Sequence, residues 1–263
     1  NTCFTIFGPA PVKAFRRRRP PLSWHMTSTL EVLFSPAEYQ ARRGTGFAGS
    51  VCVVFDVLRA TSVMLTGLAN GASGFIPVEE IAEATALRTS HPNALLAGER
   101  DGLRITAAQS GGVEFDLGNS PREYTRARVQ GRMIISTTTN GTRALRACLS
   151  APTVAVSSFL NLSATAEWLT RLAPQHVVLV GAGTAEFPAL EDILCAGALC
   201  DLLATFESDD SAKVARQAYR EVRGNLLAAV ASSRNGSRLL NNPDLREDVE
   251  WCLRRDVYHF AAV

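Results

Sequence analysis

The segment TTTNGTRAL, residues 137–145, places hydroxyls, an amide and a glycine where an apolar run gives way to a helical pattern. Backbone N–H groups at the start of a helix have no intrahelical acceptor and carry partial positive charge, so they attract phosphate or sulfonate. Asn and Thr are also common caps for those same groups. The segment therefore has two interpretations, a simple helix cap or an anion seat.

Charged residues stand at the ends of two other apolar runs. Asp56 and Arg59 follow one run in FDVLRATS, and Glu99 and Arg100 follow another in LLAGER. Asp56 is either a metal ligand or a salt-bridge partner for Arg59, and Glu99 has similar alternatives. Guanidinium groups and carboxylates around an anion seat suggest a phosphoester that is bound together with a divalent metal.

Further polar candidates lie in loops that follow predicted strands. Asp116 lies in DLGNSP, where Asp and Asn also form turns. Asp192 is a candidate metal ligand, but a carboxylate also suits the first turn of a helix. The candidates for substrate binding are Asp116, Asn119, Ser120, Thr138, Thr139, Asn140, Gly141, Thr142, Ser158 and Asn161.

Several common catalytic patterns are missing from the sequence. It has no G-x-x-x-x-G-K-[ST] loop, no Cys followed six positions later by Arg, and no second Asp two positions after Asp56. The segment RNGSR, residues 234–238, resembles the R-H-G-x-R of histidine phosphatases, but Asn235 cannot serve as the histidine nucleophile. The four histidines show no zinc spacing.

The elements that must position these residues alternate between strand-like and helix-like segments. SVCVVFDV (50–57) is a continuous apolar run, which is typical of a strand covered on both faces. Three strand-then-helix units follow one another after residue 131, and this order predicts an α/β fold with a mostly parallel sheet flanked by helices. Residues 211–233 predict a long helix with Gly224 as its candidate break, and the tail predicts a short helix and a terminal strand. Ligands of parallel sheets bind at the carboxyl ends of the strands, where the candidate residues lie.

The first 25 residues differ from the rest of the chain. They hold five basic residues, including Arg16 to Arg19, and no acidic one, which leaves 22 basic and 25 acidic residues and a net charge of −3 in the remainder. We interpret residues 1–25 as a disordered basic extension upstream of a natural start at Met26. A basic arm that binds nucleic acid is the alternative, but the acidic remainder favours a protein without a nucleic-acid partner.

Composition bounds the class of protein. The chain has 46% hydrophobic and 20% charged residues, which is ordinary for a globular domain of 263 residues. No apolar stretch approaches the length of about 18 residues that a membrane span requires. The six cysteines are scattered and lack a C-x-x-C pair, so they indicate reduced thiols and a cytoplasmic protein.

The motifs FDVLRATS, LLAGERDG, FDLGNSPREY, TTTNGTRAL, SSFLN and AGTAEFPALEDILCAG, in this order, resemble the 2-phosphosulfolactate phosphatase family. The resemblance runs from about Leu30 to the C-terminus, and FDLGNSP and TTTNGTRA are its most specific motifs. Gly181 departs from the family, which usually has Cys there, and Ala189 stands where the family has Ser. A catalytic thiol at position 181 is therefore excluded.

The resemblance implies a Mg²⁺-dependent phosphatase that converts (R)-2-phospho-3-sulfolactate to phosphate and (R)-3-sulfolactate, a step toward coenzyme M. It also implies two lobes around a cleft, for which we expect residues 26–125 and 126–263 within one catalytic unit, 26–263. We expect Mg²⁺ at Asp56, Glu99 and Asp192, and catalytic roles for Asp56, Arg59, Glu99 and Arg100. Arg59 and residues 139–142 would hold the phosphate, and Arg100 would pair with the sulfonate or carboxylate.

Several alternatives remain open beside this hypothesis. The family is also found where coenzyme M is not evidently made, so another phosphorylated 2-hydroxy acid could be the substrate. A protein that binds small phosphorylated or sulfonated acids without catalysis is a further alternative. The expected partner is a small phosphoester, with no membrane partner, and a homodimer is open.

Overall fold

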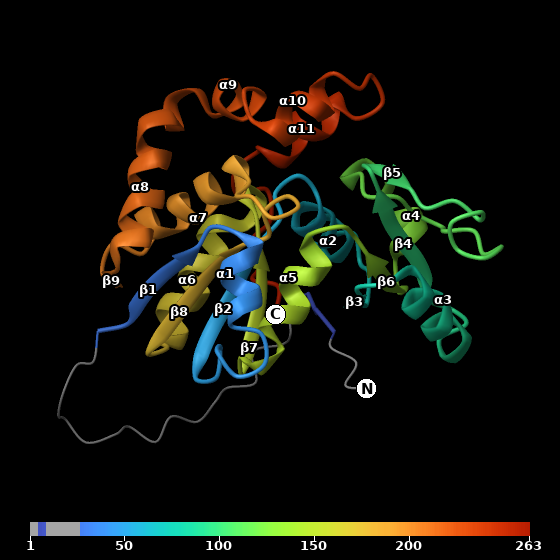
Figure 1. The fold of residues 1–263 in the computed structure, drawn as a ribbon, viewed down its shortest axis with the longest axis horizontal. Helices are drawn as coiled ribbons and strands as arrows, with labels where there is room; N and C mark the ends of the chain where they lie inside the picture. Colours follow the sequence, from blue (N-terminus) through green and yellow to red (C-terminus); the bar gives the residue numbers. More distant parts are fainter. Residues whose placement is uncertain (1–4, 9–26) are drawn as a thin grey trace.

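A computed structural model describes residues 5–8 and 27–263 of the chain. The predicted α/β fold with mostly parallel strands is confirmed, and the strands form two separate sheets (Figure 1). The larger, five-stranded sheet is parallel throughout. Its strands, in spatial order, are β7 (Thr153–Ser157), β2 (Ser50–Phe55), β8 (His176–Gly181), β1 (Thr29–Leu33) and β9 (Glu207–Ser208).

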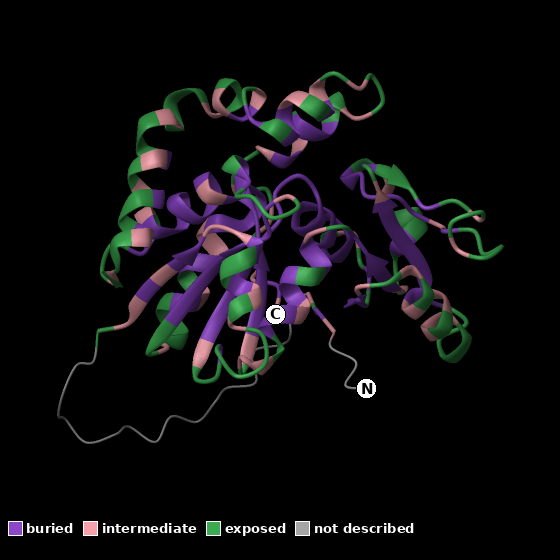
Figure 2. Ribbon diagram, in the orientation of Figure 1, coloured by how far each residue is buried: buried purple, intermediate pink, exposed green. Residues whose placement is uncertain are grey.

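The larger sheet is covered by helices on both faces, as its continuous apolar strands predict. Cys52 and Val54 of β2 pack with the helices of one face, and Val51 and Val53 pack with those of the other. Figure 2 shows β2 and β8 as buried strands, whereas the outer helices alternate between buried and exposed residues. The first face carries α1 (Pro36–Ala41), α2 (Ala60–Ala69) and α5 (Gly141–Ala147), and the second carries α6 (Leu162–Leu172), α7 (Leu190–Leu202) and α8 (Asp210–Val222).

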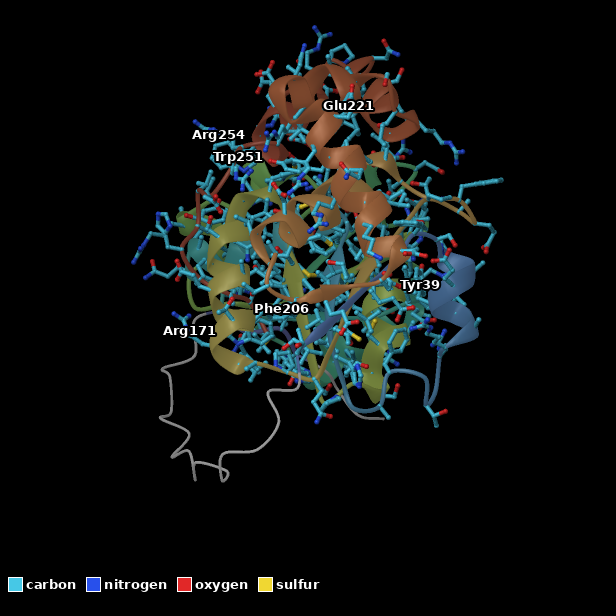
Figure 3. The ribbon with its side chains drawn as sticks, turned by 90° about the vertical axis from the view of Figure 1, so that its left-hand side faces the viewer. Tyr39, Arg171, Phe206, Glu221, Trp251 and Arg254 are labelled. Carbon is cyan, nitrogen blue, oxygen red and sulfur yellow. The ribbon has the colours of Figure 1, made fainter. Side chains whose placement is uncertain are left out.

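Helix α1 is attached to the larger sheet through Tyr39, which is labelled in Figure 3. The Tyr39 ring is buried, and its hydroxyl donates a hydrogen bond to the carbonyl oxygen of Ala182 at 3.3 Å. Ala182 directly follows β8, so this contact holds α1 beside the carboxyl end of that strand.

The smaller sheet interrupts the larger one in the sequence. Its strands, in spatial order, are β3 (Gly74–Pro77), β6 (Met133–Thr137), β4 (Leu95–Arg100) and β5 (Leu103–Arg104), with only β5 antiparallel to its neighbour. Helix α3 (Ile81–Ser90) packs on this sheet, and short helices η1 (Pro121–Glu123) and α4 (Arg126–Val129) precede β6. Asp101 and Gly102 join β4 to β5 with positive φ angles of 55° and 82°, as a type I′ hairpin turn requires.

The division between the sheets differs from the lobe boundary predicted near residue 125. Strands β1 and β2 precede that position yet belong to the larger sheet with β7 and β8, whereas β6 follows it and belongs to the smaller sheet. The smaller sheet therefore arises from an excursion of the chain over residues 74–137. The two-lobed arrangement around a cleft stays a prediction.

The C-terminal part of the chain is helical. The predicted helix over residues 211–233 ends at Val222 in α8 and is followed by η4 (Arg223–Asn225) and α9 (Leu226–Ala231), which confirms a break at Gly224. Helices α10 (Arg234–Leu240) and α11 (Arg246–Cys252) follow α9. Two short helices lie earlier in the chain, η2 (Cys148–Ser150) after α5 and η3 (Phe159–Asn161) before α6. In Figure 1 this segment crosses the top of the molecule from α8 toward β5.

Two predictions for the chain ends differ from the structure. The tail forms an isolated bridge between Ala262 and Val156 in place of a terminal strand. Ile6, inside the segment predicted to be disordered, is fully buried and exchanges backbone hydrogen bonds with Phe75 at 2.8 and 2.9 Å. The apolar character of Ile6 accounts for its burial, and residues 1–4 and 9–25 lie outside the described residues.

Among residues 5–8 and 27–263, none of the helices combines the length and the apolar character needed to cross a lipid bilayer. All five cysteines in this part of the chain are buried and free.

Candidate active site

A cavity of about 180 Å³ lies where loops from both sheets meet helix α10. Loops or turns at the ends of β2, β4, β6 and β8 reach it, so the carboxyl ends of parallel strands form much of its wall. The residues that line it are Asp56, Leu58, Arg59, Glu99, Asp101, Gly102, Asn119, Thr139, Asn140, Thr184, Ala185, Asn235 and Arg238. Six of the predicted site residues are thus brought together: Asp56, Arg59, Glu99, Asn119, Thr139 and Asn140.

Asp56 directly follows β2 and is buried at the start of the turn into α2. Its Oδ1 accepts a hydrogen bond from the Ala60 backbone N–H at 3.1 Å. Burial, together with the negative charges of Glu99 and Glu191, raises the pKa of Asp56 to about 6, against the opposing effect of the N–H groups of Ala60 and Gly141. The site therefore holds a carboxylate that is costly to ionise and that a cation would stabilise.

Glycine at position 141 allows the loop after β6 to approach Asp56. A Cβ at this position would lie 2.7 Å from Asp56 Oδ2, which is closer than real Cβ contacts. The TNGT segment therefore lies directly against the carboxylate that ends β2. Asp56 and Asn140 face the same cavity, as convergence of the loops at the strand ends requires.

Glu99, the second buried carboxylate of the cavity, fixes two loops. Its Oε1 accepts hydrogen bonds from the backbone N–H and the hydroxyl of Thr139, both at 2.8 Å. Its Oε2 accepts one from the Gly102 N–H at 2.7 Å. Glu99 therefore orients the loop after β6 and the β4–β5 turn toward the same space.

The TTTNGT segment contains both a helix cap and a polar side chain that is free to bind an anion. Thr138 and Thr142 cap each other, because the Thr142 N–H donates to Thr138 Oγ1 at 3.2 Å and the Thr138 N–H donates to Thr142 Oγ1 at 3.1 Å. Both side chains are buried away from the cavity. Asn140, at the N-cap position of α5, makes no side-chain cap hydrogen bond and lines the cavity. Its amide is therefore available to a ligand.

Arg59 is buried and forms an ion pair with a residue from the far end of the chain. Its Nη1 donates to Asp248 Oδ2 at 2.6 Å, and its Nη2 donates to the Gly102 carbonyl oxygen at 2.7 Å. Asp248 Oδ1 also accepts from Ser120 Oγ at 2.7 Å and Arg122 Nε at 2.8 Å. The sequence alternative in which Arg59 pairs with Asp56 is replaced by this buried cluster.

The other predicted site residues do not line the cavity. Arg100 donates to the Glu99 carbonyl at 2.7 Å and to Thr137 Oγ1 at 3.1 Å. Asp116 pairs with Arg88 at 2.9 Å. Ser158 and Asn161 form a capping box at η3, next to β7. The residues outside the cavity lining are Arg100, Asp116, Ser120, Thr138, Gly141, Thr142, Ser158, Asn161 and Asp192.

Asp192, the third expected metal ligand, is held by backbone groups. Its Oδ1 accepts from the Val57 N–H at 2.8 Å and its Oδ2 accepts from the Gly183 N–H at 3.1 Å. Burial, followed by the charges of Asp56 and Glu191, raises the pKa of Asp192 well above its usual range. Within the described part of the chain, no group of three or more His, Cys, Asp or Glu side chains is arranged to hold a metal ion.

Helix α10 contributes residues that sequence reasoning missed. Asn235 donates from Nδ2 to Glu191 Oε1 at 2.6 Å and to Thr184 Oγ1 at 2.7 Å, and Arg238 lines the cavity one turn further along α10. The RNGSR segment is the sequence signal for these residues, although Asn235 cannot serve as a histidine nucleophile. Asp248 carried no signal, because it lies in a helix and follows no strand.

Comparison with known proteins identifies the class. A model of the 2-phosphosulpholactate phosphatase family matches residues 37–263. A probable 2-phosphosulfolactate phosphatase of Caldicellulosiruptor saccharolyticus is 38% identical over 79% of this chain and 86% of its own length. Proteins with the same name from Caldanaerobacter subterraneus and Pseudothermotoga lettingae are 40% and 36% identical, covering 78% and 89% of this chain and 84% and 95% of their own lengths.

The matches define a phosphoric monoester hydrolase, a class that suits a cavity lined by two buried carboxylates and a buried arginine. More narrowly, the chain belongs to the 2-phosphosulfolactate phosphatase family. This confirms the resemblance drawn from the sequence motifs.

Proposed function

We propose that this protein hydrolyses (R)-2-phospho-3-sulfolactate to phosphate and (R)-3-sulfolactate with the help of Mg²⁺. The observation that carries the proposal is the convergence of Asp56, Glu99, Arg59 and Asn140 on one cavity. The names of the relatives support the substrate, and the free, buried cysteines support a cytoplasmic location.

Asp56 and Glu99 fit a Mg²⁺ ion better than the three-carboxylate set expected from sequence. Mg²⁺ in phosphate-handling enzymes is often held by one or two carboxylates, with water and substrate phosphate as the other ligands. Two buried carboxylates, Asp56 and Glu99, line the cavity, whereas Asp192 lies outside its lining. When bound, Mg²⁺ would neutralise charge on the phosphoryl oxygens.

The chain's own polar groups would orient the phosphoester. Asn140 offers a side-chain amide, and hydrogen bonds to the described residues use two of the five N–H donors of Arg59. Donors that are fixed before the substrate binds stabilise developing charge with little reorganisation. Arg59 is fixed in this way by Asp248 and by the Gly102 carbonyl.

Asp56 has two roles open to it in hydrolysis. Its carboxylate could accept a proton from attacking water or could attack phosphorus itself. A pKa of about 6 leaves Asp56 deprotonated at neutral pH, as both roles require. Acid quenching during turnover separates them, because only attack by Asp56 leaves phosphate covalently bound to the protein.

The test is phosphate release from a panel of phosphorylated 2-hydroxy acids with added Mg²⁺, with EDTA, and with EDTA followed by excess Mg²⁺. We expect release from 2-phospho-3-sulfolactate that EDTA abolishes and Mg²⁺ restores. Asp56→Asn should lose nearly all turnover while keeping its fold. Asn140→Ala should lose on the order of 10²-fold. Absence of phosphate release by the folded wild-type protein would overturn the proposal and leave a binding role.

A further inference from the structure

Arg238 differs from the other cations around the cavity. It lies on α10, its side chain is exposed, and it lines the cavity. Arg59 is neutralised by Asp248, and Arg100 is engaged by oxygens of Glu99 and Thr137. Within the described residues, the Arg238 guanidinium has neither a hydrogen bond nor an ion pair, although Asp101 lines the same cavity.

The position of Arg238 relative to the β4–β5 turn is well defined. A Cβ built on Gly102 would lie 3.9 Å from Arg238 Nη1 and 3.8 Å from Arg59 Nη2. One point at the turn is thus within 4 Å of both guanidinium groups. Arg59 reaches this point from the buried side, and Arg238 reaches it from α10 on the exposed side.

Charges of both signs line the cavity. Its carboxylates are Asp56, Glu99 and Asp101, and the two buried ones, Asp56 and Glu99, suit a phosphoryl group only when a cation screens them. A second anionic group would be repelled there and would need a cation that protein carboxylates have not already neutralised. Arg238 is such a cation, and its planar fork of N–H donors matches the oxygens of a sulfonate or carboxylate.

Resting on the function proposed above, we propose that Arg238 binds the second anionic group of the substrate and selects phosphoesters that carry one. The substrate class is therefore a small phosphate monoester with an additional sulfonate or carboxylate arm. Arg238 takes the role that the sequence suggested for Arg100. Glu99 and Arg100 are adjacent in β4, so their side chains point to opposite faces, and only Glu99 faces the cavity.

The chain offers a matched control for this cation. Arg234 is one turn earlier on the same helix and is also exposed. Its guanidinium lies over the Phe187 ring, 5.0 Å from the centroid, and it does not line the cavity. Arg234→Gln therefore removes the same charge from the same helix without touching the proposed contact.

The experiment compares two substrates in wild type, Arg238→Gln, Arg238→Lys and Arg234→Gln. 2-Phospho-3-sulfolactate carries additional anionic groups, and 4-nitrophenyl phosphate carries none besides its phosphate. For Arg238→Gln we expect kcat/KM to fall ~10–100-fold with phosphosulfolactate, mainly through KM, because a hydrogen bond to a charged group is lost. With 4-nitrophenyl phosphate we expect a change within about twofold. Arg238→Lys should be intermediate and Arg234→Gln unchanged.

A binding measurement separates this inference from the proposed activity. In calorimetric titration, 3-sulfolactate should bind Arg238→Gln at least ~10-fold more weakly than it binds wild type, whereas inorganic phosphate should bind both proteins with the same affinity. If wild type lacks turnover but shows this difference, the phosphatase function fails and the role of Arg238 stands. Equal losses with both substrates or both ligands, or no loss with either, would overturn the role of Arg238.

Discussion

At Asp56, the negative charge that its proposed role requires lowers the stability of the folded protein. Its carboxyl is buried next to the negative charges of Glu99 and Glu191, and its pKa is about 6, well above the value of 3.8 for a free side chain. A neutral carboxyl at this position would be cheaper for the fold, but a cation ligand or nucleophile must be ionised. Residues of this kind often lower stability in order to serve function.

This conflict predicts that Asp56→Asn stabilises the metal-free protein at high pH. The folded pKa is raised, so the stabilisation from a protonated Asp56 is complete below about pH 4 and is lost as pH rises through 6. A shift of about two pKa units corresponds to on the order of 3 kcal/mol. Asn is neutral at every pH, so its advantage over Asp should be larger at pH 8 than at pH 4.5 by on the order of 2 kcal/mol.

Urea unfolding in EDTA at both pH values measures this difference. Excess Mg²⁺ at pH 8 should stabilise wild type and leave the Asn variant unaffected, because ligand binding to the native state raises its stability. The interpretation fails if the variant is equally destabilised at both pH values.

The residues that could be predicted from sequence are those that follow strands. Asp56, Glu99 and Asn140 were found because the carboxyl ends of parallel strands lie at one edge of a sheet. Arg100 was predicted as a site residue because it is adjacent to Glu99, but neighbouring side chains of a strand point to opposite faces of the sheet. Arg238 and Asp248 come from C-terminal helices whose position depends on tertiary packing, which a helical pattern does not specify.

At the scale of elements, the alternation of strands and helices predicted the mostly parallel α/β class but not the separation into two sheets. Apolar strands such as β2 and β6 look alike in sequence, and strand pairing depends on contacts between distant segments. The packing of α7 against α8 likewise depends on a tertiary contact. A small residue of α7, Gly197, lies against Ala215 and Tyr219 of α8.

Gly197→Ala is predicted to destabilise the protein through this helix contact. An added Cβ would lie 2.0 Å from the Ala215 carbonyl oxygen, so backbone must move. Overpacking of this kind costs about 1–3 kcal/mol or more, and the better helix propensity of Ala offsets about 1 kcal/mol of that. Gly224→Ala is the matched control, because nothing lies within 4 Å of its added Cβ and its φ is not positive. Chemical unfolding should show a loss only for Gly197→Ala, and equal effects would contradict the packing account.

At the scale of the whole molecule, the C-terminal helices complete a site that the strand ends begin. Helix α10 supplies Asn235 and Arg238 to the cavity wall, and α11 supplies Asp248 to Arg59. Ser120 and Arg122, which follow the smaller sheet's β4–β5 hairpin, bind the same carboxylate. Three distant parts of the chain therefore meet at Asp248. At the C-terminal end of α11, the Arg254 guanidinium lies over the ring of Trp251, 4.9 Å from its centroid, and both residues are labelled in Figure 3.

Asp248→Ala is predicted to loosen this junction as well as lower stability. It leaves the buried Arg59 guanidinium without its carboxylate, and breaking a buried ion pair costs about 3–5 kcal/mol. Asp201→Ala is the control, because its partners Arg220 and Arg223 are exposed and such pairs contribute about 0–1 kcal/mol. Native-state amide hydrogen exchange should accelerate in α11 and in residues 101–123 of the Asp248 variant, with α3 unchanged. Uniform acceleration across both sheets would mean that Asp248 supports general stability, whereas the local pattern would show that α11 holds the β4–β5 turn and Arg59 in place at the cavity.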